Sequence, residues 1–136
     1  MTVANIRFAG DDPHLAQKVL IVDDDESMRH MIAEVLSTAG YAVTEASNGK
    51  EALRLLTEQK IQLVLTELVM PETEGLQLIQ QMHKAEPDVK VIAMSGSPRA
   101  ATYLSVARAL GARAALHKPL PVDQLLQTIH EVLAAP

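Results

Sequence analysis

The stretch Leu63–Pro71 constrains the fold of this chain more than any other segment. It opens with a short aliphatic run, which predicts a strand over residues 61–66 that is buried on both faces. Glu67 follows that strand directly, and Pro71 turns the chain a few residues later. The segment therefore brings one carboxylate to the loop at the carboxyl end of a buried strand.

Short apolar runs of this kind alternate with segments whose apolar residues recur every three or four positions. The runs predict strands over 18–22, 42–45, 61–66, 89–94 and 112–116. The periodic segments predict helices that begin near Ser27, after Gly49, near Gly75, at Ser97 and near Val122. Such alternation with short loops predicts an α/β fold: a five-stranded parallel sheet with helices on both faces, the (βα)5 flavodoxin-like doubly wound arrangement.

Length and composition exclude several classes of protein. The 136 residues are expected to form one domain over 18–136, after an N-terminal extension over 1–17 that lacks a sustained period. A net charge of -5 gives no electrostatic footprint for nucleic acid or for an anionic membrane. No apolar run approaches the roughly 18 residues that span a bilayer, and neither a secretory signal nor a cysteine is present. We therefore expect a cytoplasmic protein that binds neither nucleic acid nor membrane.

Three acidic residues, Asp23, Asp24 and Asp25, follow the first expected strand. Adjacent carboxylates repel one another, so this grouping is unfavourable unless a cation binds or solvent screens the charges. Mg²⁺ prefers hard oxygen ligands of this type, together with water and phosphate oxygens. The alternative is a solvated acidic turn in which Asp25 or Ser27 caps the first helix.

Polar side chains also follow the fourth and fifth expected strands, at Ser95 and Lys118. Because the carboxyl ends of parallel strands meet at one edge of the sheet, we expect these two residues in one crevice with Asp23 and Glu67. Lys118 can pair with a phosphate or a carboxylate as a point charge, or it can be exposed. Ser95 can equally belong to a turn that caps the next helix. The Lys118-Pro119 bond is a candidate cis peptide.

Taken together, these features resemble the receiver domain of two-component response regulators. The resemblance rests on an acidic pair after the first strand, an acid after the third, a hydroxyl after the fourth and a lysine before proline after the fifth. In this chain the set is Asp23-Asp24, Glu67 with Met70-Pro71 and Gly75 behind it, Ser95, and Lys118-Pro119. The pattern covers about residues 18–133.

The resemblance implies a site for Mg²⁺ and for a phosphoryl group. In that family the acid after the third strand accepts the phosphoryl group from a histidine kinase. The metal ligands implied here are Asp23, Asp24, Glu67 and the backbone carbonyl of Val69. Ser95 would bond the phosphoryl oxygens and Lys118 would neutralise them, since phosphoryl transfer depends mainly on positioning and charge stabilisation.

Two positions depart from the family pattern. Glu67 stands where the family has Asp, and its extra methylene advances the carboxylate by up to about 1.5 Å. Because a misplacement of about 1 Å can cost about 100-fold in rate, we expect that Glu67 is not phosphorylated. Its fixed charge would instead imitate the phosphorylated state in part. Ala115 stands where the family usually has an aromatic residue, which weakens this mimicry unless Tyr103 supplies a ring.

The resemblance implies a stand-alone signalling module and not an enzyme. Its expected partners are a histidine kinase or phosphotransfer protein, and a downstream protein that binds the region 97–133. Arg99, Arg108 and Arg113 in that region suit an acidic or a self-complementary partner, so a homodimer is among the expectations. A solvated face is the alternative.

Two other classes share part of the pattern. Asp23-x-Asp25 resembles the opening motif of haloacid-dehalogenase-like phosphatases, with Asp23 as nucleophile, but the later acidic metal motif of those enzymes has no clear counterpart after Ser95. A still phosphorylatable receiver is a further alternative. A flavodoxin-like cofactor-binding protein would share the fold, yet no glycine-rich loop follows the first strand.

Overall fold

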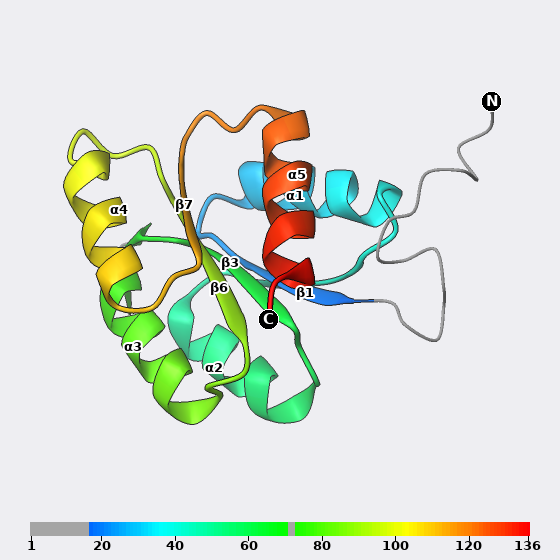
Figure 1. The fold of residues 1–136 in the computed structure, drawn as a ribbon, viewed down its shortest axis with the longest axis horizontal. Helices are drawn as coiled ribbons and strands as arrows, with labels where there is room; N and C mark the ends of the chain where they lie inside the picture. The colour runs from blue at the N-terminus through cyan, green and yellow to red at the C-terminus, as the bar shows by residue number, and fades with distance from the viewer. Residues whose placement is uncertain (1–16, 71–72) are drawn as a thin grey trace.

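The structure is a computed structural model that describes residues 17–70 and 73–136. Its centre is a five-stranded parallel sheet in the order β2-β1-β3-β6-β7 (Figure 1). The strands of this sheet are β1 (Lys18–Val22), β2 (Ala42–Ala46), β3 (Leu63–Glu67), β6 (Lys90–Ser95) and β7 (Ala114–His117). The helices are α1 (Glu26–Thr38), α2 (Gly49–Glu58), α3 (Gly75–Ala85), α4 (Ala100–Ala109) and α5 (Val122–Ala134). The predicted α/β architecture is confirmed, whereas residues 1–16 of the predicted N-terminal extension lie outside the described part of the chain.

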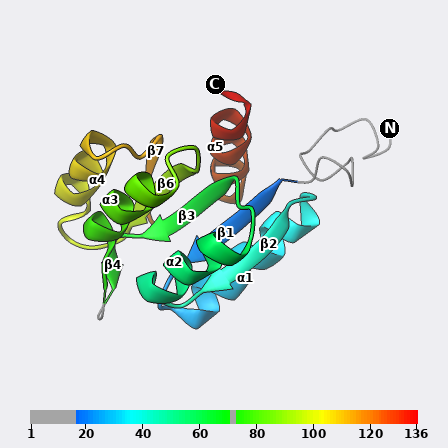
Figure 2. The ribbon, with the colours of Figure 1, turned by 90° about the horizontal axis from the view of Figure 1, so that it is seen from below.

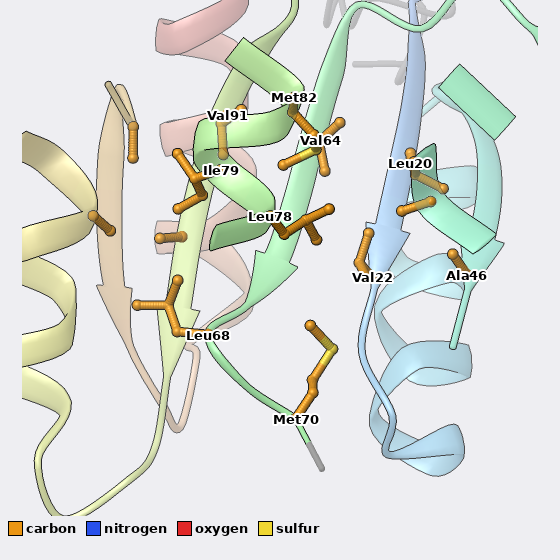
Figure 3. Close-up of a cluster of buried hydrophobic side chains, with 14 of the residues drawn as sticks. Leu20, Val22, Ala46, Val64, Leu68, Met70, Leu78, Ile79, Met82 and Val91 are labelled. Atoms are coloured by element: carbon orange, nitrogen blue, oxygen red, sulfur yellow. The ribbon is translucent and has the colours of Figure 1, made fainter. Parts of the chain in front are cut away.

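Helices cover both faces of the sheet, so the domain has three layers (Figures 1 and 2). The helices α1 and α5 pack on one face, and α2, α3 and α4 pack on the other. Successive residues of a strand point to opposite faces, so Val19 and Ile21 pack under α1 and α5 while Leu20 and Val22 pack under α2 and α3 (Figure 3). This two-sided burial explains why β1 and β3 read as continuous aliphatic runs.

Two helices begin with polar caps, of which the sequence predicts the first. The Asp25 side chain accepts a hydrogen bond from the backbone N–H of Met28 at the start of α1, and the Asn48 side chain accepts one from Glu51 at the start of α2. Gly40 follows α1 with a φ of 104°, a left-handed conformation that glycine adopts without steric cost. Asp25 thus serves as a helix cap, as one of the two interpretations of the acidic run proposed.

The helix α4 begins later than the sequence predicts. Ser97 was expected as its cap with Pro98 at the first helical position, but the helix starts at Ala100. The Ser97 hydroxyl instead accepts a hydrogen bond from the backbone N–H of Arg99, and the Ser97 carbonyl accepts one from Ala100. These bonds form a separate turn before the helix, because a serine hydroxyl satisfies nearby backbone donors in turns as well as at helix ends.

A short antiparallel ribbon follows β3, where the sequence predicts only a loop. It consists of β4 (Val69–Met70) and β5 (Thr73–Glu74), which pair directly. Gly75 lies immediately after β5, and its backbone N–H donates to the Leu68 carbonyl at 3.0 Å. A Cβ on Gly75 would lie only 2.4 Å from the Leu68 Cα and 2.5 Å from the Leu68 carbonyl oxygen. The close approach of the two backbones therefore requires glycine at this position.

Within the part of the chain that the structure describes, no helix is long and apolar enough to cross a bilayer.

We predict that Gly75→Ala destabilises the domain, because the added methyl group overlaps the Leu68 backbone rather than a movable side chain. Overpacking of this kind costs about 1–3 kcal/mol. Urea unfolding followed by circular dichroism measures the loss. The control is Gln77→Ala at an exposed position of the same helix, which should change stability by less than about 0.5 kcal/mol. Equal effects of the two substitutions would show that the close contact has no energetic importance.

Candidate functional site

Four polar residues meet at the carboxyl edge of the sheet. Asp23 follows β1 directly, Glu67 ends β3, Ser95 ends β6 and Lys118 follows β7. The strand order places β1, β3, β6 and β7 side by side, so the topology brings the four residues together although up to 95 positions separate them along the chain. Asp23, Glu67 and Ser95 are all buried. The four residues thus gather at one end of the sheet, at the edge where parallel α/β sheets place their sites.

Lys118 forms ion pairs with both buried carboxylates. Its Nζ atom lies 2.6 Å from Glu67 Oε1 and 2.9 Å from Asp23 Oδ2. Burial is the largest single influence on the pKa of Lys118 and lowers it. The hydrogen bonds that the Lys118 ammonium donates to Glu67 and Asp23, together with the negative charges of these carboxylates, outweigh burial and raise the pKa above its ordinary value of 10.5. Lys118 is therefore a charged member of the site and not an exposed lysine.

The Glu67 carboxylate turns its second oxygen back toward its own backbone. Glu67 Oε2 accepts hydrogen bonds from the backbone N–H of Leu68 at 2.8 Å and of Val69 at 3.1 Å. With Lys118 on Oε1, the carboxylate has three donors. Donors on both oxygens therefore hold the Glu67 carboxylate in one orientation.

Asp23 is held from two sides. The backbone N–H of Asp25 donates to Asp23 Oδ1 at 3.0 Å. The Arg29 guanidinium donates to the backbone carbonyl of Asp23 at 2.8 Å and pairs with Glu45 Oε1 at 3.0 Å. Arg29 was not among the residues that the sequence indicated, because its acceptors are a backbone carbonyl and a side chain on β2. In the sequence, only the positive charge of Arg29 and its position near the start of the predicted helix could have indicated that it lies near the site.

Ser95 and Lys118 are fixed to each other through their backbones. The Lys118 N–H donates to the Ser95 carbonyl at 2.9 Å, and the Lys118-Pro119 bond is cis, as the sequence suggested. The Ser95 hydroxyl accepts from the backbone N–H of Ser97 at 3.3 Å. Among residues 17–70 and 73–136, the Glu67 carboxylate makes no hydrogen bond with that hydroxyl. Ser95 therefore contacts both Lys118 and the turn before α4, whose helix has no side-chain cap, and its role toward a phosphoryl group stays a prediction.

One of the residues implied as metal ligands, Asp24, is exposed. In the described ranges, no three carboxylate or imidazole side chains converge as they would to hold a metal ion. The full ligand set of Asp23, Asp24, Glu67 and the Val69 carbonyl stays a prediction.

Comparison with known proteins assigns the family. Residues 19–130 match the response regulator receiver domain. The chain is 33% identical over 119 residues to the chemotaxis protein CheY of Thermotoga maritima. The alignment covers 87% of this chain and 98% of that protein. The chain is 32% identical over 119 residues to the response regulator receiver protein CpdR of Brucella abortus, with 88% and 98% coverage. A CheY-like receiver domain from Methanospirillum hungatei superposes with a TM-score of 0.82 at 30% identity, over 87% of this chain and 94% of that one.

The chain belongs to the receiver domain family of two-component response regulators. Receiver domains are signalling modules of phosphorelays that interact with histidine kinases or phosphotransfer proteins and with downstream targets, and they generally bind Mg²⁺ at their acidic pocket. The phosphatase alternative finds no support in this assignment. Its second acid, Asp25, is engaged as the cap of α1.

We predict that Lys118 makes the stability of the domain fall steeply in strong base. The pKa of Lys118 is higher in the folded state than its ordinary value of 10.5, so the stabilisation is complete below about pH 10.5 and is lost as the pH rises through the folded value. The midpoint of urea unfolding, measured from pH 9 to 12, should fall more in the parent than in Lys118→Met.

The control for this experiment removes a second group that titrates in the same range. Tyr41 is buried, burial raises its pKa, and its hydroxyl is the one buried side-chain polar atom without a hydrogen-bond partner among the described residues. Both chains should therefore carry Tyr41→Phe. Parallel pH profiles of the two chains would contradict a charged, ion-paired Lys118.

Proposed function

We propose that this receiver domain signals without phosphorylation, with Glu67 as a permanent negative charge at the phosphoacceptor position. The observation that carries the proposal is the set of three donors on the Glu67 carboxylate: Lys118 on one oxygen and the N–H groups of Leu68 and Val69 on the other. A carboxylate that nucleophilically attacks phosphorus needs a free, correctly placed oxygen. The longer side chain of Glu67 and its engaged oxygens both oppose that placement.

The same carboxylate supplies part of what a phosphoryl group would supply. It places a negative charge 2.6 Å from the Lys118 ammonium, which is the group that neutralises phosphoryl oxygens in this family. It carries a charge of -1, whereas a phosphoryl group carries about -1.5 to -2. The Ser95 hydroxyl is not among its partners. We therefore propose a partial imitation of the phosphorylated state, limited to the Lys118 side of the site.

The output of the domain would be binding of a protein partner through the surface 97–133, which includes α4, β7 and α5. Arg99, Arg108 and Arg113 are exposed there, and so are the apolar side chains of Val106 and Val122. Exposed apolar side chains and exposed arginines in one region suit a partner that offers both apolar and acidic groups. A histidine kinase or phosphotransfer protein remains a proposed upstream partner, and a homodimer through the same surface is the alternative occupant.

We predict that the parent chain forms no phosphoryl adduct with acetyl phosphate and Mg²⁺, whereas Glu67→Asp does. Restoring the shorter side chain should raise the rate of adduct formation by at least about 100-fold, since placement errors of about 1 Å cost that much. Intact-mass measurement over time provides the rate, and Glu67→Asn is the control without an acceptor. A stoichiometric adduct on Glu67 in the parent would refute the proposed phosphorylation-independent function.

Mimicry requires a separate measurement. The backbone amide chemical shifts of residues 97–133 should be recorded for the parent, for Glu67→Asn and for phosphorylated Glu67→Asp. We expect the parent shifts to lie between those of the two variants, because Glu67 engages Lys118 but not Ser95. Parent shifts that coincide with those of Glu67→Asn would refute mimicry while leaving the absence of phosphorylation intact.

A further inference from the structure

The acidic pocket of this chain contains its own cation. Asp23 and Glu67 bring two negative charges to a buried site, and the Lys118 ammonium contacts an oxygen of each, at 2.9 Å and 2.6 Å. The side chains of all three residues are largely buried, with exposed fractions of 1%, 8% and 14% for Asp23, Glu67 and Lys118. Bulk water therefore contributes little to balancing these charges, and the ammonium is the principal counter-ion.

The oxygens of both buried carboxylates already have protein donors. Asp23 Oδ1 accepts from the Asp25 N–H, and Asp23 Oδ2 faces Lys118. Glu67 Oε1 also faces Lys118, and Glu67 Oε2 accepts from two backbone N–H groups. Each oxygen of the pair therefore has at least one protein donor, so a metal ion would share every one of these oxygens with an existing hydrogen bond or ion pair.

A magnesium ion and the ammonium cannot comfortably share these oxygens. Mg²⁺ binds oxygen ligands at about 2.0–2.1 Å in a near-octahedral arrangement. An ion at that distance from Glu67 Oε1 would lie less than about 5 Å from Lys118 Nζ, which is itself 2.6 Å from the same oxygen. Like charges at such a separation repel strongly in a buried site. Metal binding would therefore require the displacement of Lys118.

The backbone around Lys118 resists that displacement. Lys118 N–H is bonded to the Ser95 carbonyl, which fixes the base of the side chain. Gly96 lies against its aliphatic stem: a Cβ at Gly96 would be 3.1 Å from Lys118 Cβ and 3.6 Å from Lys118 Cδ. The stem is thus packed along the chain, and the ammonium is preorganised between the two carboxylates.

From these contacts we infer that Lys118 is the resident counter-ion of the pocket and excludes Mg²⁺, in contrast to the metal-binding pocket of the family. The inference concerns binding in the absence of any phosphodonor, and it stands whether or not Glu67 accepts a phosphoryl group. The predicted ligand set requires that the parent chain binds Mg²⁺, whereas this inference requires that it does not, so the affinity of the parent chain for Mg²⁺ distinguishes them.

The test is a titration of the parent chain with MgCl₂ at neutral pH, followed by the backbone amide shifts of residues 23–25 and 67–69. We expect no saturable change up to about 10 mM MgCl₂ and no change in Tm between EDTA and MgCl₂, because a ligand that binds only the folded state raises Tm. Saturable shifts in both segments with a matching rise in Tm would overturn the inference.

Lys118→Met supplies the complementary measurement, since it removes the ammonium and keeps an apolar stem. This variant should gain Mg²⁺ affinity by at least tenfold and should show a Tm that rises with MgCl₂. Lys50→Met, at an exposed position of α2, is the control for the loss of one positive charge and should behave as the parent. A folded Lys118→Met that ignores Mg²⁺ would overturn the inference, and if this variant folds neither with nor without Mg²⁺ the titration of the parent decides alone.

Discussion

The ion pairs of Lys118 with Asp23 and Glu67 fix the positions of the three charged side chains at this end of the sheet. They join the ends of β1, β3 and β7, three strands that are brought together only by the completed sheet. A buried ion pair is weak evidence for net stability, because removing charges from water is costly. Removing only one partner of the pair is nevertheless strongly unfavourable, since the other charge is then buried without a partner. The three charges therefore depend on one another, and each constrains where the others can lie.

The glutamate at the end of β3 also organises the chain that follows it. Its carboxylate uses the N–H groups of Leu68 and Val69, and the Leu68 carbonyl in turn accepts from Gly75. The ribbon of β4 and β5 is thus continuous with the acceptor position. An aspartate, shorter by one methylene, would hold its carboxylate nearer the backbone. In this chain Glu67 contacts Lys118 with one oxygen while its other oxygen accepts from the backbone that follows it.

The sequence predicted what depends on periodicity and left out what depends on individual contacts. The aliphatic runs around Leu20 and Val64 identified the buried strands because both faces of the sheet are covered. The two-residue strands β4 and β5 are too short to show any period, and the start of α4 depends on which backbone groups Ser97 bonds. The sequence placed Lys118 at the correct edge of the sheet. That its ammonium contacts two carboxylates and not solvent follows from burial, which no local pattern encodes.

Ala115 stands where the receiver family usually has an aromatic residue, so this chain lacks a ring at that position of β7. Ala115 and Tyr103 both pack, partly buried, against the cluster beneath α2, α3 and α4, so neither lies in the pocket itself. The direct connection is backbone: Lys118 bonds Ser95, and Ser97 bonds Ser95 on one side and the start of α4 on the other. Backbone hydrogen bonds therefore link Lys118 through the end of β6 to the turn before α4, and this link needs no aromatic ring.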